Sequence, residues 1–188
     1  MIKFKKMDPK FILSGKAAQR YVELNEALLK FSELFVYNAG DDRAIVIIGG
    51  SYLDIVLEHV LRAFFPEDDS EVERLIEYNQ PLGTFGNRVR MVYCLGLIEK
   101  IVKDDLKLIG KIRNQFAHDL YASFEDKAIK SWCRELKWHK VSMMMEPPAD
   151  ATIRDLYQVG VNQLISYLNG AIAFARGNKR TVIQNYKV

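Results

Sequence analysis

Apolar residues recur at spacings of three and four along nearly the whole chain. This spacing matches the 3.6 residues per turn of an α-helix, and no stretch alternates between apolar and polar residues for long enough to predict a sheet. We therefore predict an all-α fold, a single-domain bundle of about six or seven helices over residues 1–188. Residues 1–13 are expected to form a loose basic arm, and residues 177–188 a polar basic tail.

The pattern places seven helices, over residues 16–37, 41–65, 70–78, 84–95, 98–118, 124–136 and 151–175. The second of them is apolar nearly all round, which is typical of the central helix of a bundle. Gly49 and Gly50 in its middle lower its helix propensity, and they predict that the backbone of a neighbouring helix approaches closely there. The predicted bundle is thus built around residues 41–65 and 98–118.

Three charged residues of this central helix, Asp54, Glu58 and Arg62, lie at steps of four residues. One interpretation is structural, with an ion pair between Glu58 and Arg62 and a bond from Asp54 to a neighbouring helix. The other is functional, with Asp54 or Glu58 facing and orienting Arg113 or His118. Both carboxylates are therefore candidate binding residues.

The helix over residues 98–118 carries the strongest suggestion of chemistry. One face is apolar, and the opposite face carries a lysine stripe that leads to Asn114 and His118, one turn apart. Arg113 falls between the two faces. Arg113, Asn114 and His118 are the candidate catalytic residues. In a structural alternative, Asn114 and His118 cap the helix end and Arg113 pairs with Asp54 or Glu58, and in a third interpretation the same surface binds a partner.

Basic residues form two lines that are candidates for binding. Lys107 and Lys111 belong to the stripe on residues 98–118, and Lys127, Lys130 and Arg134 lie along the following helix. Lysine lines suit phosphate groups, but on amphipathic helices they are more commonly solvated faces. The formal net charge of +3, from 27 basic and 24 acidic residues, does not by itself indicate a nucleic-acid partner.

Other classes of site find little support. Three scattered histidines and two distant cysteines predict no zinc site, no cofactor motif is present, and both cysteines are expected to be buried thiols. Residues 1–10 lack the apolar run of a secretory signal. The apolar stretch 44–65 contains Asp54, Glu58, His59 and Arg62, which argues against a membrane span. We expect a cytoplasmic protein.

Several motifs together resemble the mannitol operon repressor family. They are the hexapeptide Arg-Asn-Gln-Phe-Ala-His at 113–118 after Asp105-Leu106 and Ile109, Ser51-x-Leu53 with Leu57, the Pro-Leu-Gly-Thr-Phe loop at 81–85, Arg88, and Leu-Gly-Leu-Ile at 95–98. The resemblance covers roughly residues 50–120. It implies an all-helical fold and a role in transcriptional control of sugar-alcohol uptake.

The sequence does not show how such a regulator would read DNA. It contains no helix-turn-helix, zinc-finger or basic-zipper pattern, and its lysine stripes carry no means of distinguishing bases. We therefore expect action through a protein partner, such as a DNA-binding regulator, and no direct sequence-specific binding to DNA.

The hexapeptide also resembles the Arg-polar-x-x-x-His motif of HEPN-type helical domains, many of which are metal-independent endoribonucleases. In that alternative, His118 would transfer a proton, Arg113 would stabilise charge on the phosphorane, and Asn114 would position the phosphate. RNA would then be the partner. Because one histidine supplies one proton-transfer group, the alternative implies a homodimer with two copies of His118 across one cleft.

Overall fold

The computed structural model describes residues 15–37, 41–67, 69–142, 147 and 149–183. Within these residues the chain forms seven helices of two turns or more and one single turn. They are α1 (Gly15–Tyr37), α2 (Asp42–Phe64), α3 (Asp69–Ile76), α4 (Phe85–Cys94), α5 (Lys100–His118), α6 (Lys127–Glu135), the single turn α7 (Trp138–Val141) and α8 (Ile153–Gly177). The all-α prediction is confirmed, and α7 is the one element that the sequence pattern did not predict.

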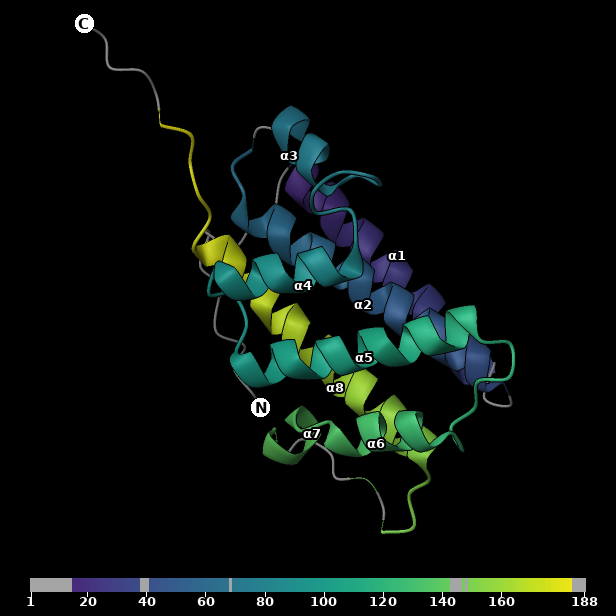
Figure 1. Cartoon of the computed structure of the whole chain (residues 1–188). Helices are drawn as coiled ribbons and strands as arrows, with labels where there is room; N and C mark the ends of the chain where they lie inside the picture. The colour runs from purple at the N-terminus through teal and green to yellow at the C-terminus, as the bar shows by residue number, and fades with distance from the viewer. Residues whose placement is uncertain (1–14, 38–40, 68, 143–146, 148, 184–188) are drawn as a thin grey trace, which may run out of the picture.

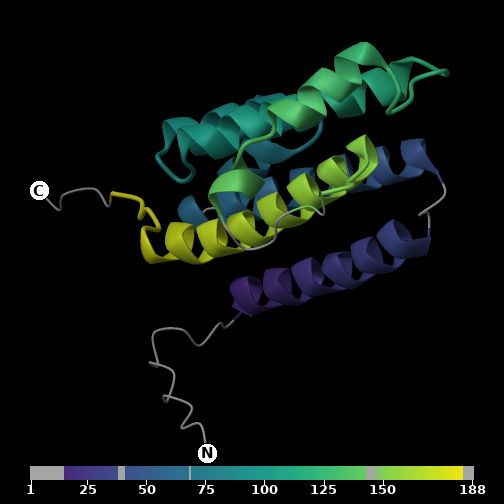
Figure 2. The ribbon, with the colours of Figure 1, turned by 90° about the horizontal axis from the view of Figure 1, so that it is seen from below.

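The helices lie in three layers, which Figure 2 shows edge-on. α4, α5 and α6 form one outer layer, α2 and α8 form the middle, and α1 covers the far side. α2 packs against α1, α4, α5 and α8, so it is the central helix that its composition predicted (Figure 1). By length and composition α2 would also suffice to cross a membrane, but more than half of its most apolar stretch is buried inside the fold.

Other parts of the chain approach the paired glycines of α2 closely, as predicted. The groups that approach are side chains, however, and not the helix backbone that the sequence predicted. A Cβ atom on Gly49 would lie 3.3 Å from the Tyr157 hydroxyl oxygen and 3.4 Å from a ring carbon of Phe35. A Cβ atom on Gly50 would lie only 2.8 Å from Cδ of Arg113. The two glycines therefore admit side chains from three different helices onto the centre of α2.

The apolar face of α5 is buried as predicted, and it ends in an aromatic cluster. Phe116 packs against Phe124, and Phe124 against Tyr157 of α8. Phe124 lies before α6, because the backbone N–H of Ser123 donates to the Asp126 carboxylate in a turn that delays the helix start to Lys127. The side chain of Phe124 nevertheless enters the core.

Some side chains lie elsewhere than the periodicity placed them. The spacing of apolar residues in 16–37 predicts that Tyr21 of α1 is buried, but it is 52% exposed. Cys94 at the end of α4, also predicted to be buried, is exposed. Cys133 is buried, and burial raises the pKa of its thiol to about 12. Near the end of α8, the apolar spacing of residues 151–175 predicts that either Phe174 or Ala175 is the last buried residue, and the structure buries Ala175.

The predicted terminal arm and tail are only partly covered by the described residues. Residues 1–13 lie outside them, as does the Met143-Met144-Met145 run. The beginning of the tail, directly after α8, contacts the C-terminal end of α2. There the backbone N–H of Arg180 donates to the carbonyl of Phe64, and the Lys179 ammonium pairs with Glu67.

Candidate functional site

Arg113, the first of the three candidate catalytic residues, lies against α2. Its aliphatic chain packs over Gly50, and its Nε is buried without a hydrogen-bond partner among the described residues. Its charge is felt by Asp54 one turn further along α2, where burial raises the pKa of the carboxyl and the charges of Arg88 and Arg113 oppose that rise. Arg113 therefore belongs to the packing between α5 and α2.

The other two candidates, Asn114 and His118, are exposed on α5. His118 is the last residue of the helix. In the part of the chain that the structure describes, neither side chain makes a hydrogen bond to Arg113. The three residues are close in sequence but face different surroundings within one chain, so a catalytic role for them stays a prediction.

Asp54 and Glu58 bind an arginine that the sequence-based interpretation had not paired with them. Arg88 of α4 lies 2.9 Å from a carboxylate oxygen of Asp54 and 2.9 Å from one of Glu58. The predicted pair between Glu58 and Arg62 is confirmed at 2.8 Å. No ion pair joins these carboxylates to Arg113 or His118 in the described residues, so the orienting role proposed for them is not seen.

Arg88 also holds the loop between α3 and α4. Its guanidinium donates to the carbonyls of Leu82 and Ile76, at 2.9 and 3.0 Å, and the residue is buried. Within the loop, a Cβ atom on Gly83 would lie 2.4 Å from the carbonyl oxygen of Glu77. The Pro-Leu-Gly-Thr-Phe motif is therefore a tightly packed structural turn that Arg88 ties to α2.

The candidate basic residues are spread over the outer layer. Lys107, Lys111, Lys127 and Arg134 are exposed, and Lys130 pairs with Glu125. The Lys111 ammonium lies 5.9 Å from the ring centroid of Trp132, which links α5 to α6. These positions are compatible with binding, and equally with a solvated face.

The C-terminal end of α5 is capped by a residue outside the predicted motif. Arg43, near the start of α2, donates to the backbone carbonyls of Phe116, Asp119 and Leu120. A cation at this end also complements the helix dipole. Capping by Asn114 and His118 was one of the alternatives that the sequence left open. A long-range contact such as that of Arg43 leaves no local signal in the sequence.

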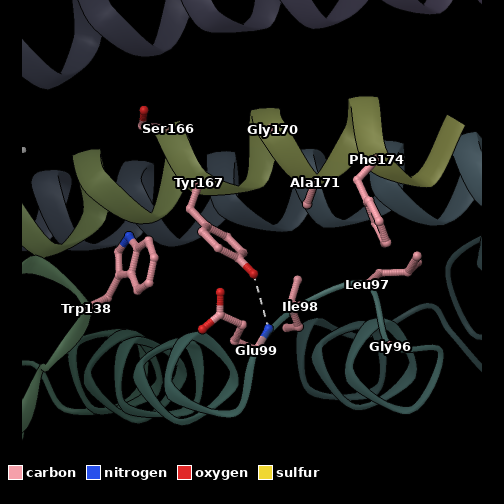
Figure 3. Close-up of a pocket in the computed structure, with 10 residues that line it drawn as sticks. All are labelled: Gly96, Leu97, Ile98, Glu99, Trp138, Ser166, Tyr167, Gly170, Ala171 and Phe174. Atoms are coloured by element: carbon pink, nitrogen blue, oxygen red, sulfur yellow. Dashed lines mark hydrogen bonds between the residues drawn. The ribbon is translucent and has the colours of Figure 1, made fainter. Parts of the chain in front are cut away.

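Three segments enclose an apolar depression of about 630 Å³ (Figure 3). They are the turn before α5, the single turn α7, and the C-terminal half of α8. Residues 96–99, Trp138, and five residues of α8 line it. The α8 residues are Ser166, Tyr167, Gly170, Ala171 and Phe174. Phe174 is 55% exposed at this site. The depression brings together three segments that are far apart in the sequence.

Two aromatic rings form one end of the depression. Trp138 and Tyr167 meet edge to face, with ring centroids 4.7 Å apart and planes at 73°. The hydroxyl of Tyr167 accepts a hydrogen bond of 3.1 Å from the backbone N–H of Glu99, which Figure 3 shows as a dashed line. The first residue of the turn, Gly96, has φ of +70°, a backbone conformation that favours glycine.

Trp138 is held in place by a buried carboxylate. Asp105 of α5 is 2% exposed and accepts hydrogen bonds from the backbone N–H groups of Lys137 and Trp138 at the start of α7. Burial raises the pKa of Asp105, and these two backbone hydrogen bonds oppose the rise. Asp105 thus anchors the single turn that carries the tryptophan.

A second depression, of about 410 Å³, is polar. It lies between α1, α2 and α3 and contains His59, Arg62 and Glu73. Burial lowers the pKa of His59, and Arg62 binds both carboxylate oxygens of Glu73. Among the described residues, no group of three His, Cys, Asp or Glu side chains is arranged to hold a metal ion.

Sequence reasoning missed the apolar depression. A pattern of helices identifies faces but not which ends of α5, α7 and α8 meet. Two local signals were present. Gly170 leaves one position of the long last helix without a side chain, and the choice between Phe174 and Ala175 left one large apolar side chain without a place in the core. Neither signal shows which other segments of the chain meet α8 at the depression.

Comparison with known proteins gives a family and a fold. The profile of a family described as "Mannitol repressor" matches residues 43–173, which run from the start of α2 into the last turns of α8. A chain in the X-ray structure of the MtlR–HPr complex from Escherichia coli has a TM-score of 0.53 and 24% identity, and the match covers 81% of this chain and 98% of that one. No match was found among curated proteins. Since the family profile spans more than half of the sequence, the chain belongs to the mannitol repressor family.

Proposed function

We propose that this protein is a cytoplasmic transcriptional regulator that acts by binding a protein partner, and not by reading DNA itself. One observation carries the proposal. The described surface contains an apolar depression of about 630 Å³ beside Phe174, an aromatic side chain that is more than half exposed. Concave apolar surfaces with exposed aromatic residues are typical of protein-binding sites.

The similar chain from Escherichia coli was crystallised as a complex with HPr. We therefore propose a protein of the HPr kind as the partner. The family profile covers every residue that lines the depression except Phe174. This supports the proposal that the depression is the docking site.

The basic residues support contact with a partner more than readout of a DNA sequence. Lys107, Lys111 and Lys127 are exposed on α5 and α6. An ammonium group binds a phosphate as a point charge and does not discriminate between bases as a bidentate arginine, asparagine or glutamine does. Any DNA contact through these lysines would be weak in sequence preference and steeply dependent on salt.

Gly170 offers a direct test of the docking site. A Cβ atom there meets nothing within 4 Å, so the variant Gly170→Leu places a side chain in the depression without disturbing the core. Gly86→Leu is the matched control, because Gly86 is also helical and exposed, with open space at Cβ, but lies on α4 away from the depression.

We expect Gly170→Leu to weaken HPr binding at least tenfold in isothermal titration calorimetry, and Gly86→Leu to bind as the wild type does. The tenfold change corresponds to about 1.4 kcal/mol of lost interaction. If the wild type binds no HPr, the proposed partner is wrong. If it binds HPr and both glycine variants bind equally well, the depression is not the docking site.

A further inference from the structure

We propose that the corner formed by Trp138, Tyr167 and Glu99 receives a cationic side chain of the protein partner, with arginine the preferred residue. This inference rests on the proposed function, because it specifies the chemistry of the same docking site. It concerns what the partner must present at one end of the depression.

The two rings have the geometry of a site for a cation. Their planes meet at 73°, so the two aromatic rings border the same corner at a steep angle to one another. A cation close to the face of such a ring is attracted by its quadrupole, and tryptophan is the strongest of the aromatic residues in this respect. A guanidinium group can also stack on one ring, because it is planar.

Glu99 supplies the negative charge. It is the one charged residue among those that line the depression, and Figure 3 shows its carboxylate in the space between Trp138 and Tyr167. Glu99 precedes α5 as its N-cap residue, but its side chain makes no capping hydrogen bond. No ion pair occupies Glu99 in the part of the chain that the structure describes, so its carboxylate is available to a partner.

The lysines nearest to Glu99 in the sequence do not neutralise it. The Lys100 and Lys103 ammonium groups both pair with Asp104, at 2.6 and 2.9 Å. The depression is therefore an electronegative apolar site on a chain whose formal net charge is +3. Charge complementarity favours a basic residue flanked by apolar side chains as the occupant.

Tyr167 fixes the position of the turn that carries Glu99. Its hydroxyl oxygen accepts the Glu99 backbone hydrogen bond, which links the ring to the turn that carries the carboxylate. Asp105 independently anchors the turn that carries Trp138. The corner is thus assembled before a partner arrives, which reduces the entropy cost of binding.

The fluorescence of Trp138 can report whether a ligand occupies the corner. The chain contains two tryptophans, so a Trp132→Phe background leaves Trp138 as the single fluorophore. The probes are the capped peptide Leu-Arg-Leu and its neutral isostere with citrulline in place of arginine. Both are titrated into the background protein and into two further variants of it, Glu99→Gln and the control Glu125→Gln. The control removes an exposed carboxylate of the outer layer that does not line the depression and leaves Lys100 and Lys103 paired with Asp104.

We expect the arginine peptide to change Trp138 fluorescence and to bind about fivefold more tightly than the citrulline peptide. Glu99→Gln should remove this preference, and Glu125→Gln should retain it. Equal binding of the two peptides, or a preference that survives Glu99→Gln, would overturn the inference.

Titration of HPr separates this inference from the proposed function. If HPr binds the wild type and the Glu99→Gln variant equally, the cationic corner is wrong and the partner stands. If HPr does not bind but the arginine preference depends on Glu99, the proposed partner is wrong and the corner stands.

Discussion

Replacement of Arg88 tests how the structure supports the loop and the central helix. The variant Arg88→Met keeps a long unbranched side chain but removes the guanidinium group. In the wild type this group contacts the carboxylates of Asp54 and Glu58 and the carbonyls of Leu82 and Ile76. All four acceptors would lose this partner at once, and among the described residues only Glu58 would keep another, its ion pair with Arg62.

The magnitude follows from the burial of these acceptors. Removal of one member of a buried ion pair typically costs about 3–5 kcal/mol of folding free energy. Here the carboxylates of Asp54 and Glu58 are 24% and 30% exposed, so water replaces part of what is lost. We therefore expect Arg88→Met to lower the free energy of unfolding by about 3 kcal/mol at pH 7, and Arg88→Lys by about 1–2 kcal/mol because it keeps the charge.

The cost of Arg88→Met should depend on pH. Burial raises the pKa of Asp54 and Arg88 opposes this rise, so the variant raises that pKa further. A carboxyl whose pKa is raised on folding favours the folded state below its unfolded pKa, and this contribution is lost as the pH rises through the folded value. The difference between the wild type and the variant should therefore be largest near pH 7 and shrink as the pH falls toward about 4.

Urea unfolding of the three proteins at pH 7 and at pH 4.5, followed by circular dichroism, measures these differences. A loss below about 1 kcal/mol at pH 7 would refute the reasoning, because four acceptors would then have been replaced at little cost. A loss that does not change with pH would show that the carboxylates contribute nothing to it.

Further substitutions test other parts of the structure. Gly83→Ala should destabilise the protein by about 2 kcal/mol or more in thermal unfolding, because its Cβ would meet the Glu77 carbonyl oxygen at 2.4 Å. Asp105→Asn should cost about 1–2 kcal/mol in urea unfolding, since the amide keeps one acceptor oxygen and puts an NH2 donor in place of the oxygen that accepts from the Lys137 N–H at 3.0 Å. Gly170→Ala should stabilise α8 by up to about 1 kcal/mol in the same assay, and no stabilisation would contradict the open space at its Cβ. His118→Ala should change stability by less than about 0.5 kcal/mol, because the side chain is exposed. Loss of RNA cleavage in EDTA on that substitution would instead establish the ribonuclease alternative.

Helical periodicity predicted the fold well because burial of an apolar stripe is the main determinant of these helices. The buried face of α5 and the central position of α2 both follow from it. The periodicity failed for Tyr21, since α1 is an outer helix whose packing is with α2, and a stripe on such a helix extends beyond what one neighbour can cover.

The partners of charged residues could not be predicted from the sequence. Asp54 forms an ion pair with Arg88 and not with Arg113 of the hexapeptide, although each arginine is more than thirty residues from Asp54 in the sequence. Sequence spacing gives the face of a helix but not the neighbour that meets it. The corner of Trp138, Tyr167 and Glu99 could not be predicted for the same reason. Trp138 lies on the single turn α7, and the carboxylate that holds this turn, Asp105, is distant in the sequence.

Hydrogen–deuterium exchange with and without HPr tests the central claim most directly. The proposed docking site predicts slower exchange on addition of HPr in residues 96–99 and in residues 166–174 of α8, with little change in α1. Unchanged exchange in both segments, together with protection on α1 or along the lysine stripe of α5, would contradict the proposed docking site.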